Sequence, residues 1–254
     1  MGGASALLTR RGAAFAALLA ALVAYYVWRE SLPNLSLWWD VGVIALVLMP
    51  AVFALIWFLL PLRRARGLVL VGIALAVLAI VLQKGGFGLA ANFVKLGAMA
   101  ALAWAFLELF ETVAWVALVA AIVPWVDAYS VWRGPTHHIV AHQPHLFTTL
   151  SFAFPVPGER GSANLGLPDL LFFSLFLGAS VRFGLRPGWT WLALTASFGA
   201  TMAIAVGFDV SGLPALPLLS LAFFAANGDL LWRAVRLRRE AAESRERRGG
   251  AEAG

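Results

Sequence analysis

Long apolar runs recur along almost the whole chain and are interrupted by charged or proline-containing segments. Each run has about eighteen residues or more, which lets an α-helix cross a hydrocarbon layer about 30 Å thick. Charged residues make up 13% of the chain, against roughly a quarter in soluble domains. These features exclude a water-soluble fold. The sequence predicts an all-α fold, a polytopic transmembrane helix bundle.

Eight helices are expected to cross the membrane, and together they form one domain, residues 1–232. The expected spans are 13–28, 37–60, 67–82, two crossings within 87–132, and then 168–181, 189–208 and 213–232. The two crossings within 87–132 are expected to turn near Glu108 and Glu111. Residues 233–254 hold seven arginines and four glutamates, so we expect a charged, solvated helix end that runs into disorder.

The distribution of lysine and arginine predicts the orientation. With the N-terminus inside, fourteen arginines lie on the inner side and four lysines or arginines on the outer side. Both termini are then cytoplasmic, and the polar segment 134–165 lies on the other face of the cell (inner) membrane. Orientation accounts for the net charge of +6, so no nucleic-acid partner is expected. The absence of cysteine excludes disulfides and thiolate metal sites.

Asp127 and Asp169 place carboxyl groups within the expected hydrocarbon layer. A carboxylate there is costly unless it is neutralised, paired or hydrated, so it indicates a function. Asp127 lies six residues before Arg133, near the outer end of one span, and Asp169 lies five residues after Asn164, near the outer start of the next. Both are then roughly 7–9 Å below the same membrane face, at about 1.5 Å per residue. We therefore expect the two carboxyls to meet.

A pair of carboxyls in such a site has the groups needed for acid–base hydrolysis. The two groups cannot both ionise in a low-dielectric site, so they share one proton. The ionised member takes a proton from a water that attacks a peptide carbonyl, while the protonated member hydrogen-bonds the carbonyl oxygen and later protonates the amine. Alternatively, Asp169 caps a helix start and Asp127 reaches the interface. A third interpretation is a proton-coupled transporter or channel that uses both acids as a relay.

Two prolines interrupt the last span. Pro214 and Pro217 each remove an amide donor and disfavour helix at the preceding residue, which predicts irregular backbone over 213–216 at membrane depth. Irregular backbone is tolerated at that depth only against protein or water. The alternative is an ordinary helix start with proline in its first turn.

Three motifs together resemble the presenilin and signal peptide peptidase family of intramembrane aspartyl proteases. They are an aspartate within a span (WVDAYSVW), a Gly-Leu-x-Asp at the start of the next span (LGLPDLLFFS), and a Pro-Ala-Leu in the last span. The resemblance covers about residues 124–232. It implies that Asp127 and Asp169 are the catalytic aspartates, that the catalytic core is about 111–232, and that the substrates are transmembrane helical peptides. The substrate-seating residues that it implies are Gly166, Leu167, Pro168, Pro214, Ala215 and Leu216.

The chain departs from the family pattern at several positions. The family has Gly-x-Gly-Asp, whereas a stiff proline, Pro168, precedes Asp169 here. The tyrosine that usually precedes the first acid is Val126, with Tyr129 on the other side. The family has nine spans with the first acid on the sixth, and we expect eight with the first acid on the fifth, which a missing first helix would explain. The predicted orientation is similar to that of signal peptide peptidase and implies type II substrates.

The polar segment 134–165 contains two further patterns. Leu150, Phe152 and Phe154 alternate with smaller or more polar residues, which predicts a strand. An edge strand there would pair with an unwound substrate segment, as family members are understood to do; alternatively, its aromatics pack onto the lipid headgroups. The histidines are His137, His138, His142 and His145. Imidazole binds zinc, but no HExxH pattern accompanies them, so neither a metal ion nor a cofactor is expected.

Two other charged positions are expected to be structural. Lys95 lies within an apolar run, where we expect a packing or topological role. Asp229 and Arg233 are spaced for an i to i+4 ion pair near the inner interface.

Overall fold

The computed structural model describes residues 2–133, 149–210 and 213–252, and in these ranges the chain forms helices and one β-hairpin. The helices are α1 (Gly2–Trp28), η1 (Arg29–Ser31), α2 (Leu37–Val43), η2 (Ile44–Leu48), α3 (Met49–Leu59), η3 (Leu60–Arg64), α4 (Leu68–Lys84), α5 (Gly88–Leu107), α6 (Val113–Arg133), α9 (Leu167–Arg182), α10 (Pro187–Gly207) and α11 (Leu216–Glu252). The strands are β1 (Ser151–Pro155) and β2 (Ser162–Gly166). The predicted helix bundle is confirmed.

Several of these helices are suited to a bilayer, where every backbone polar group must be satisfied within the helix. Within the described ranges, five are long and apolar enough to cross a membrane: Thr9–Ser31, Leu37–Arg64, Gly88–Leu107, Val113–Ser130 and Pro187–Gly207. Helix α4 is apolar but shorter. The turn predicted near Glu108 and Glu111 is confirmed, because α5 ends at Leu107 and α6 begins at Val113.

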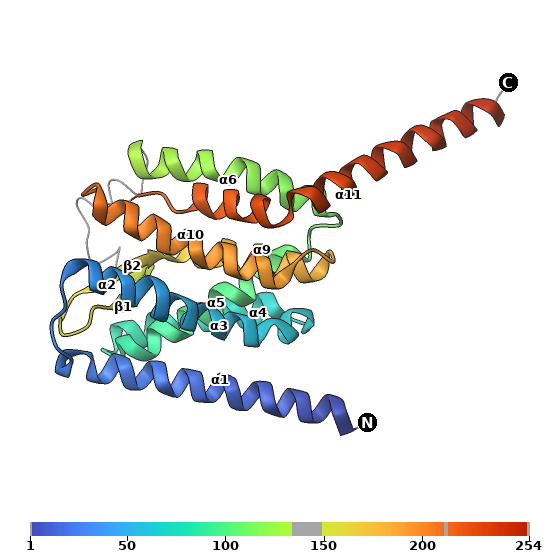
Figure 1. Ribbon diagram of the computed structural model, residues 1–254. Coiled ribbons are helices and arrows are strands. Elements are labelled where there is room, and N and C mark those ends of the chain that lie inside the picture. The colour runs from blue at the N-terminus through green and yellow to red at the C-terminus, as the bar shows by residue number, and fades with distance from the viewer. Residues whose placement is uncertain (1, 134–148, 211–212, 253–254) are drawn as a thin grey trace.

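Helix α9 lies at the centre of the bundle (Figure 1), where it contacts α5, α10, α11 and α6. Every residue from Phe173 to Ser180 is buried, the pattern of a helix enclosed on all sides. Gly178 lets α5 approach closely, since a Cβ there would lie 2.7 Å from the indole ring of Trp104. The Trp104 indole N–H donates to the Ser174 carbonyl at 3.0 Å. These contacts fix the position of α9 against α5.

An aromatic cluster joins α9 to α3 and α10. The Phe53 ring stacks on Phe173 with centroids 4.3 Å apart and packs on Phe198 at 5.2 Å. Phe53 lies in α3, which continues α2 and η2 as one helical segment. In this segment a single π-helical turn, Ile44–Leu48, precedes Pro50. Proline lacks the backbone N–H donor, and the wider π-helical turn lets the helix continue without that hydrogen bond. The span predicted for 37–60 therefore continues through Pro50.

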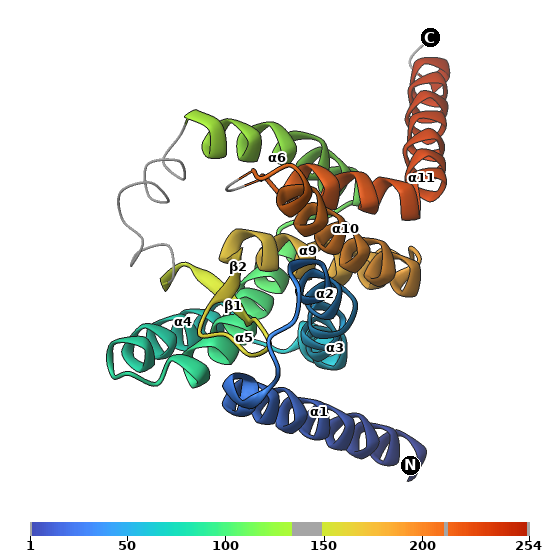
Figure 2. The same ribbon diagram turned by 60° about the vertical axis from the view of Figure 1, so that its left-hand side comes forward.

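The two strands form an antiparallel hairpin with Ser151 opposite Gly166 and Pro155 opposite Ser162. The hairpin packs on α5 through β1 and leads into α9 through β2 (Figure 2). The strand predicted from the alternation of Phe152 and Phe154 is confirmed, and both rings are fully buried in the core. Leu150 precedes the strand and is exposed.

Helix α11 begins inside the bundle and ends outside it. It continues through Glu252, and its last turns project away from the other helices (Figures 1 and 2). The structure thus describes most of residues 233–254 as a continuation of the helix. The disorder expected for this charged tail stays a prediction.

Candidate active site

Asp169 lies in the first turn of the central helix α9. Gly166 is the N-cap residue and Pro168 occupies the first turn, where its missing N–H costs no helical hydrogen bond. The Asp169 carboxyl lies against the Gly166 backbone N–H, in the place of the capping contact that an acid three residues into a helix makes. Asp169 therefore stands where the capping role considered for it would place it.

Gly166 lies directly against the Asp169 carboxyl. A Cβ added to Gly166 would lie 3.1 Å from Asp169 Oδ2, which is tighter than ordinary van der Waals contact. Glycine therefore leaves room for the carboxyl beside the end of β2. Gly166 belongs to the family motif, and it lies in contact with the second acid.

Asp127 lies on α6, three residues after Pro124, a proline within the helix. Its Oδ2 accepts a hydrogen bond from the Leu216 backbone N–H at 3.1 Å. This bond joins the first acid to the Pro-Ala-Leu motif, 89 positions further along the chain. The carboxyl is thus directed at the start of α11.

Asp127 and Asp169 lie on two helices, α6 and α9, that pack against each other and against α11. Asp127 is near enough for its charge to influence the Asp169 carboxyl. Both residues are half-buried. The structure brings together the helices that carry the two acids, and direct contact between the two carboxyls stays a prediction.

The backbone before α11 is irregular, as predicted. Residues 213–215 lie outside any helix, and α11 begins at Leu216. Pro217 follows in the first turn, so the alternative of proline near a helix start also holds for that residue. Ala215 and Leu216 are buried in the core. The last residue of the motif thereby presents its N–H to Asp127 at the first position of the helix, where no intrahelical acceptor is available.

The aromatic side chains of the hairpin pack in the core of the protein. Phe152 and Phe154 are fully buried, and Phe152 packs edge-on against Phe93 of α5. Their rings therefore form the hairpin's anchor in the core. Strand β2 was not predicted, and it ends at Gly166, beside Asp169. Its polar sequence, SANLG, gives no hydrophobic alternation.

The histidine pattern predicted neither a metal ion nor a cofactor. His137, His138, His142 and His145 lie outside the described residues. Among the residues that the structure describes, no three His, Asp or Glu side chains are grouped so that they could hold a metal ion.

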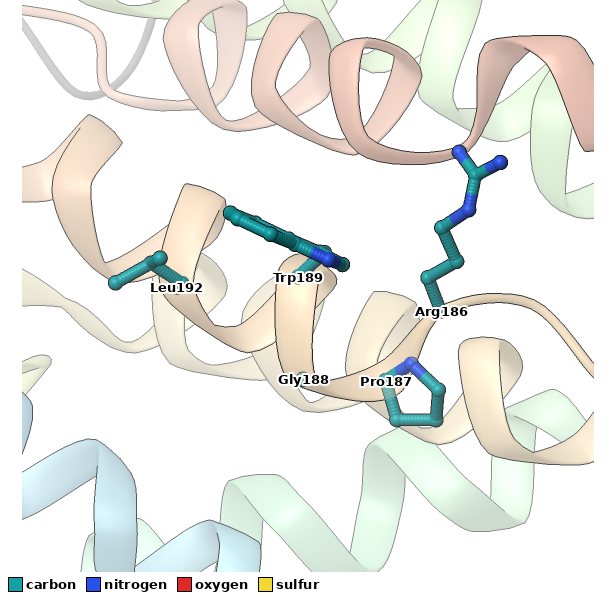
Figure 3. A pocket seen from close by; sticks show the side chains of 5 residues that line it. All are labelled: Arg186, Pro187, Gly188, Trp189 and Leu192. Carbon is teal, nitrogen blue, oxygen red and sulfur yellow. The ribbon is translucent and has the colours of Figure 1, made fainter.

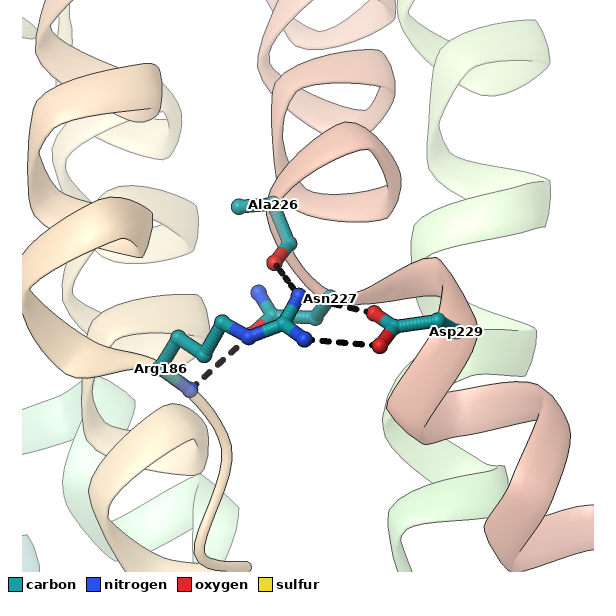
Figure 4. Close-up of polar contacts among 4 residues, drawn as sticks. All are labelled: Arg186, Ala226, Asn227 and Asp229. Atoms are coloured by element: carbon teal, nitrogen blue, oxygen red, sulfur yellow. Dashed lines mark hydrogen bonds and ion pairs between the residues drawn. The ribbon is translucent and has the colours of Figure 1, made fainter.

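The other polar cluster joins the α9–α10 connection to α11 (Figure 4). Arg186 donates to both carboxylate oxygens of Asp229, at 2.8 and 2.7 Å, and to the Ala226 carbonyl at 3.2 Å. Asn227 accepts from the Arg186 N–H at 3.1 Å and donates to Thr190 at 2.8 Å. The prediction that Asp229 pairs with Arg233 is wrong, because Arg186 reaches the carboxylate from the α9–α10 connection.

A shallow pocket of about 380 Å³ lies beside this cluster, at the start of α10 (Figure 3). It is lined by Arg186, Pro187, Gly188, Trp189 and Leu192. Arg186 follows the C-terminal end of α9, whereas Asp169 lies at the N-terminal end of the same helix, about 20 Å away at 1.5 Å per residue. This pocket is therefore separate from the aspartate pair.

Comparison with models of known protein families and with curated proteins gave no match for this chain. The resemblance to the presenilin and signal peptide peptidase family therefore rests on the three sequence motifs alone.

Proposed function

We propose that this chain is an intramembrane aspartyl protease that hydrolyses peptide bonds within transmembrane segments. The observation that carries the proposal is the convergence of Asp127, Asp169 and Leu216 from three separate helices. A helix cap alone would account for Asp169, but it would not account for an acid on α6 bonded to the Pro-Ala-Leu element. Each of the three motifs is local in sequence, and a hydrolytic site requires all three at one place.

The proposed mechanism needs only the two carboxyls and a water molecule. The ionised carboxyl removes a proton from the water, and the oxygen of the water attacks the peptide carbonyl carbon. The protonated carboxyl first donates a hydrogen bond to the carbonyl oxygen. It then gives its proton to the amide nitrogen as the C–N bond breaks, so that the amine leaves and the other carboxyl retains the proton taken from water. The Leu216 and Gly166 N–H groups hold Asp127 and Asp169 in fixed directions. Fixed directions reduce the reorganisation that the reaction requires.

The proposal is tested with purified protein in liposomes and a reporter peptide that spans the membrane. We expect two fragments, identified by mass spectrometry, that share one new terminus within the apolar segment. A transporter or channel that uses the same acids would leave the peptide intact and show acid-driven flux. A catalytically silent relative would bind the reporter helix and give neither fragments nor flux.

In this function the chain crosses the cell membrane eight times with both termini in the cytoplasm. The bias of arginine toward one side supports this orientation. The aspartates then lie near the outer ends of α6 and α9, and the substrates have type II orientation. Covalent labelling of the histidine segment in intact cells tests the topology. Labelling from outside is expected, and labelling from the cytoplasmic side would contradict the orientation.

The hairpin would present an extended substrate to the aspartates through β2. Asn164 stands opposite Ala153 in the register, and the N–H and C=O of Ala153 bond to the Asn92 side chain and not to β2. Ala153 and Asn164 are therefore a non-hydrogen-bonded pair, and in an antiparallel ladder the backbone N–H and C=O groups of both members of such a pair point away from the partner strand. The Asn164 N–H and C=O therefore face outward, and within the described part of the chain neither makes a hydrogen bond. A peptide strand paired there would lie two residues from Gly166 and beside Asp169.

Replacing Asn164 with proline should weaken cleavage about tenfold, because the outward N–H that would bind the substrate is lost. The substitution removes no backbone hydrogen bond between β1 and β2, and an outward edge position is one that proline tolerates in a strand. The bond that Ser151 Oγ donates to Asn164 Oδ1 at 3.2 Å is lost in Asn164→Pro and in Asn164→Ala alike. Asn164→Ala retains the N–H and serves as the control. The measurement is kcat/KM for the reporter peptide. Equal values for the proline and alanine variants would contradict pairing at β2.

Replacing Pro168 with glycine should give activity equal to or above that of the parent. The change restores the glycine that the family has before the second acid. It lowers the free energy of unfolding by at most about 1 kcal/mol, because glycine gives the unfolded chain more conformational freedom. Initial cleavage rates of the reporter at matched protein concentration provide the test. Complete loss of cleavage would show that the proline itself is required.

A further inference from the structure

The outer edge of β1 is closed by side chains from two helices. The C=O groups of Ser151, Ala153 and Pro155 alternate along β1 and face away from β2. Lys95 Nζ donates to the Ser151 carbonyl at 3.1 Å, Asn92 Nδ2 to the Ala153 carbonyl at 2.9 Å, and Tyr25 Oη to the Pro155 carbonyl at 2.8 Å. Tyr26 Oη donates to the Ala153 carbonyl at 2.7 Å.

Asn92 reproduces the pairing that a third strand would make. Its Oδ1 accepts from the Ala153 N–H at 2.9 Å while its Nδ2 donates to the carbonyl of the same residue. Asn92 and Lys95 are one turn apart on α5, which places them on one face of the helix, and both are buried. Polar side chains at membrane depth are costly unless they find partners, and here their partners are the groups of a strand edge.

The two edges of the hairpin are therefore unequal. On β1 the outward groups are occupied by α1 and α5, whereas on β2 the outward N–H and C=O of Asn164 are unoccupied within the described residues. An extended peptide added to β1 would lie against α5 and away from Asp169. A peptide added to β2 would run past Leu167, the first residue of α9, which carries Asp169. Which edge is open thus decides whether a paired peptide reaches the aspartates.

We infer that Asn92, together with Lys95, Tyr25 and Tyr26, is a set of positioning residues that close β1 and thereby direct an extended peptide to β2. This inference rests on the proposed function. Beyond the proposed function, the inference assigns to these four residues the role of determining the substrate register. They are remote from the aspartates in sequence. None of the four side chains is required to touch the reacting atoms.

The test compares Asn92→Leu with Asn227→Leu. Both substitutions replace a buried asparagine by an apolar side chain of similar size, and both remove side-chain bonds that join separate elements. Only Asn92 contacts the hairpin. Asn92→Leu should raise KM for the reporter peptide about fivefold and produce a second cleavage position. Asn227→Leu should retain the parent KM and the single cleavage position, although both variants lower the melting temperature.

The inference is overturned if both variants change KM and the cleavage position equally, or if neither variant changes them. Cleavage by the parent protein would still support the proposed function in that case. If Asn92→Leu does not fold, Tyr26→Phe removes only the hydroxyl that donates to Ala153, and Tyr129→Phe on the exposed face of α6 is its control. We then expect about a twofold rise in KM for Tyr26→Phe alone. Equal KM values for the two would overturn the inference.

Amide hydrogen exchange decides the inference even if no peptide is cleaved. In the parent protein the Ala153 amide should exchange slowly without peptide, and the Asn164 amide should become protected only when peptide is added. Asn92→Leu should accelerate exchange at Ala153 at least about tenfold. If Ala153 exchanges as fast as Asn164 in the parent protein, β1 is not closed and the inference is wrong.

Discussion

Replacing Asp169 with asparagine is expected to lower the rate of peptide cleavage by about 100- to 10,000-fold, the range that a positioned acid or base contributes. Asparagine has nearly the same shape and its side-chain oxygen can still accept from the Gly166 N–H, so the helix cap is retained. Only the ability to exchange a proton is lost. The same loss is expected for Asp127→Asn, whose side-chain oxygen can still accept from Leu216. The double variant should be no slower than either single one, since the two carboxyls act as a unit.

Asp40 supplies a matched control for these variants. It is a buried aspartate on α2, outside the site, and its Oδ1 has no hydrogen-bond partner among the described residues. Asp40→Asn should leave the cleavage rate within about twofold of the parent, as expected for a change remote from the reacting groups. Cleavage by Asp169→Asn at the rate of the Asp40 variant would show that Asp169 is a helix cap and nothing more.

Replacing Leu216 with proline should lower kcat by about 10- to 150-fold, corresponding to about 1.5–3 kcal/mol for a hydrogen bond to a charged group. The substitution removes the N–H that donates to Asp127. Leu216 is the first residue of α11, a position at which proline is tolerated because no intrahelical bond is lost.

Leu216→Ala separates the backbone bond from the side chain. Alanine loses the buried leucine packing and keeps the N–H. Both variants should show a lower melting temperature than the parent, and only the proline variant should show the large loss in kcat. A larger loss in the alanine variant would mean that packing at the motif, and not its hydrogen bond to Asp127, supports catalysis.

The helices of this chain could be predicted because a bilayer leaves few alternatives. An apolar run must satisfy its own backbone groups, so its length and its charged ends define the helix. This reasoning placed the turn at Glu108 and Glu111 and the irregular backbone before Leu216. It also identified Asp127 and Asp169, because acids stand out against an apolar background, whereas Gly166 was identified only through the resemblance to the protease family.

The features that the sequence did not reveal depend on pairing between distant segments. Strand β2 has only five residues and no alternation, and it exists because β1 lies beside it. Asp229 was assigned to Arg233 on the same helix, whereas the fold brings Arg186 to it from the α9–α10 connection. The spacing of Asn92 and Lys95 on one face of α5 was a usable signal. What they bind became evident only once the hairpin was placed.

The most direct test of a water-activating aspartate pair is cleavage of the reporter helix in water enriched in ¹⁸O, followed by mass spectrometry of the fragments. The parent protein should produce an N-terminal fragment whose new carboxyl group carries one ¹⁸O atom. The Asp127→Asn, Asp169→Asn double variant should produce no fragment. An intact reporter with the parent protein, or labelled fragments in equal amount from the double variant, would contradict catalysis by Asp127 and Asp169.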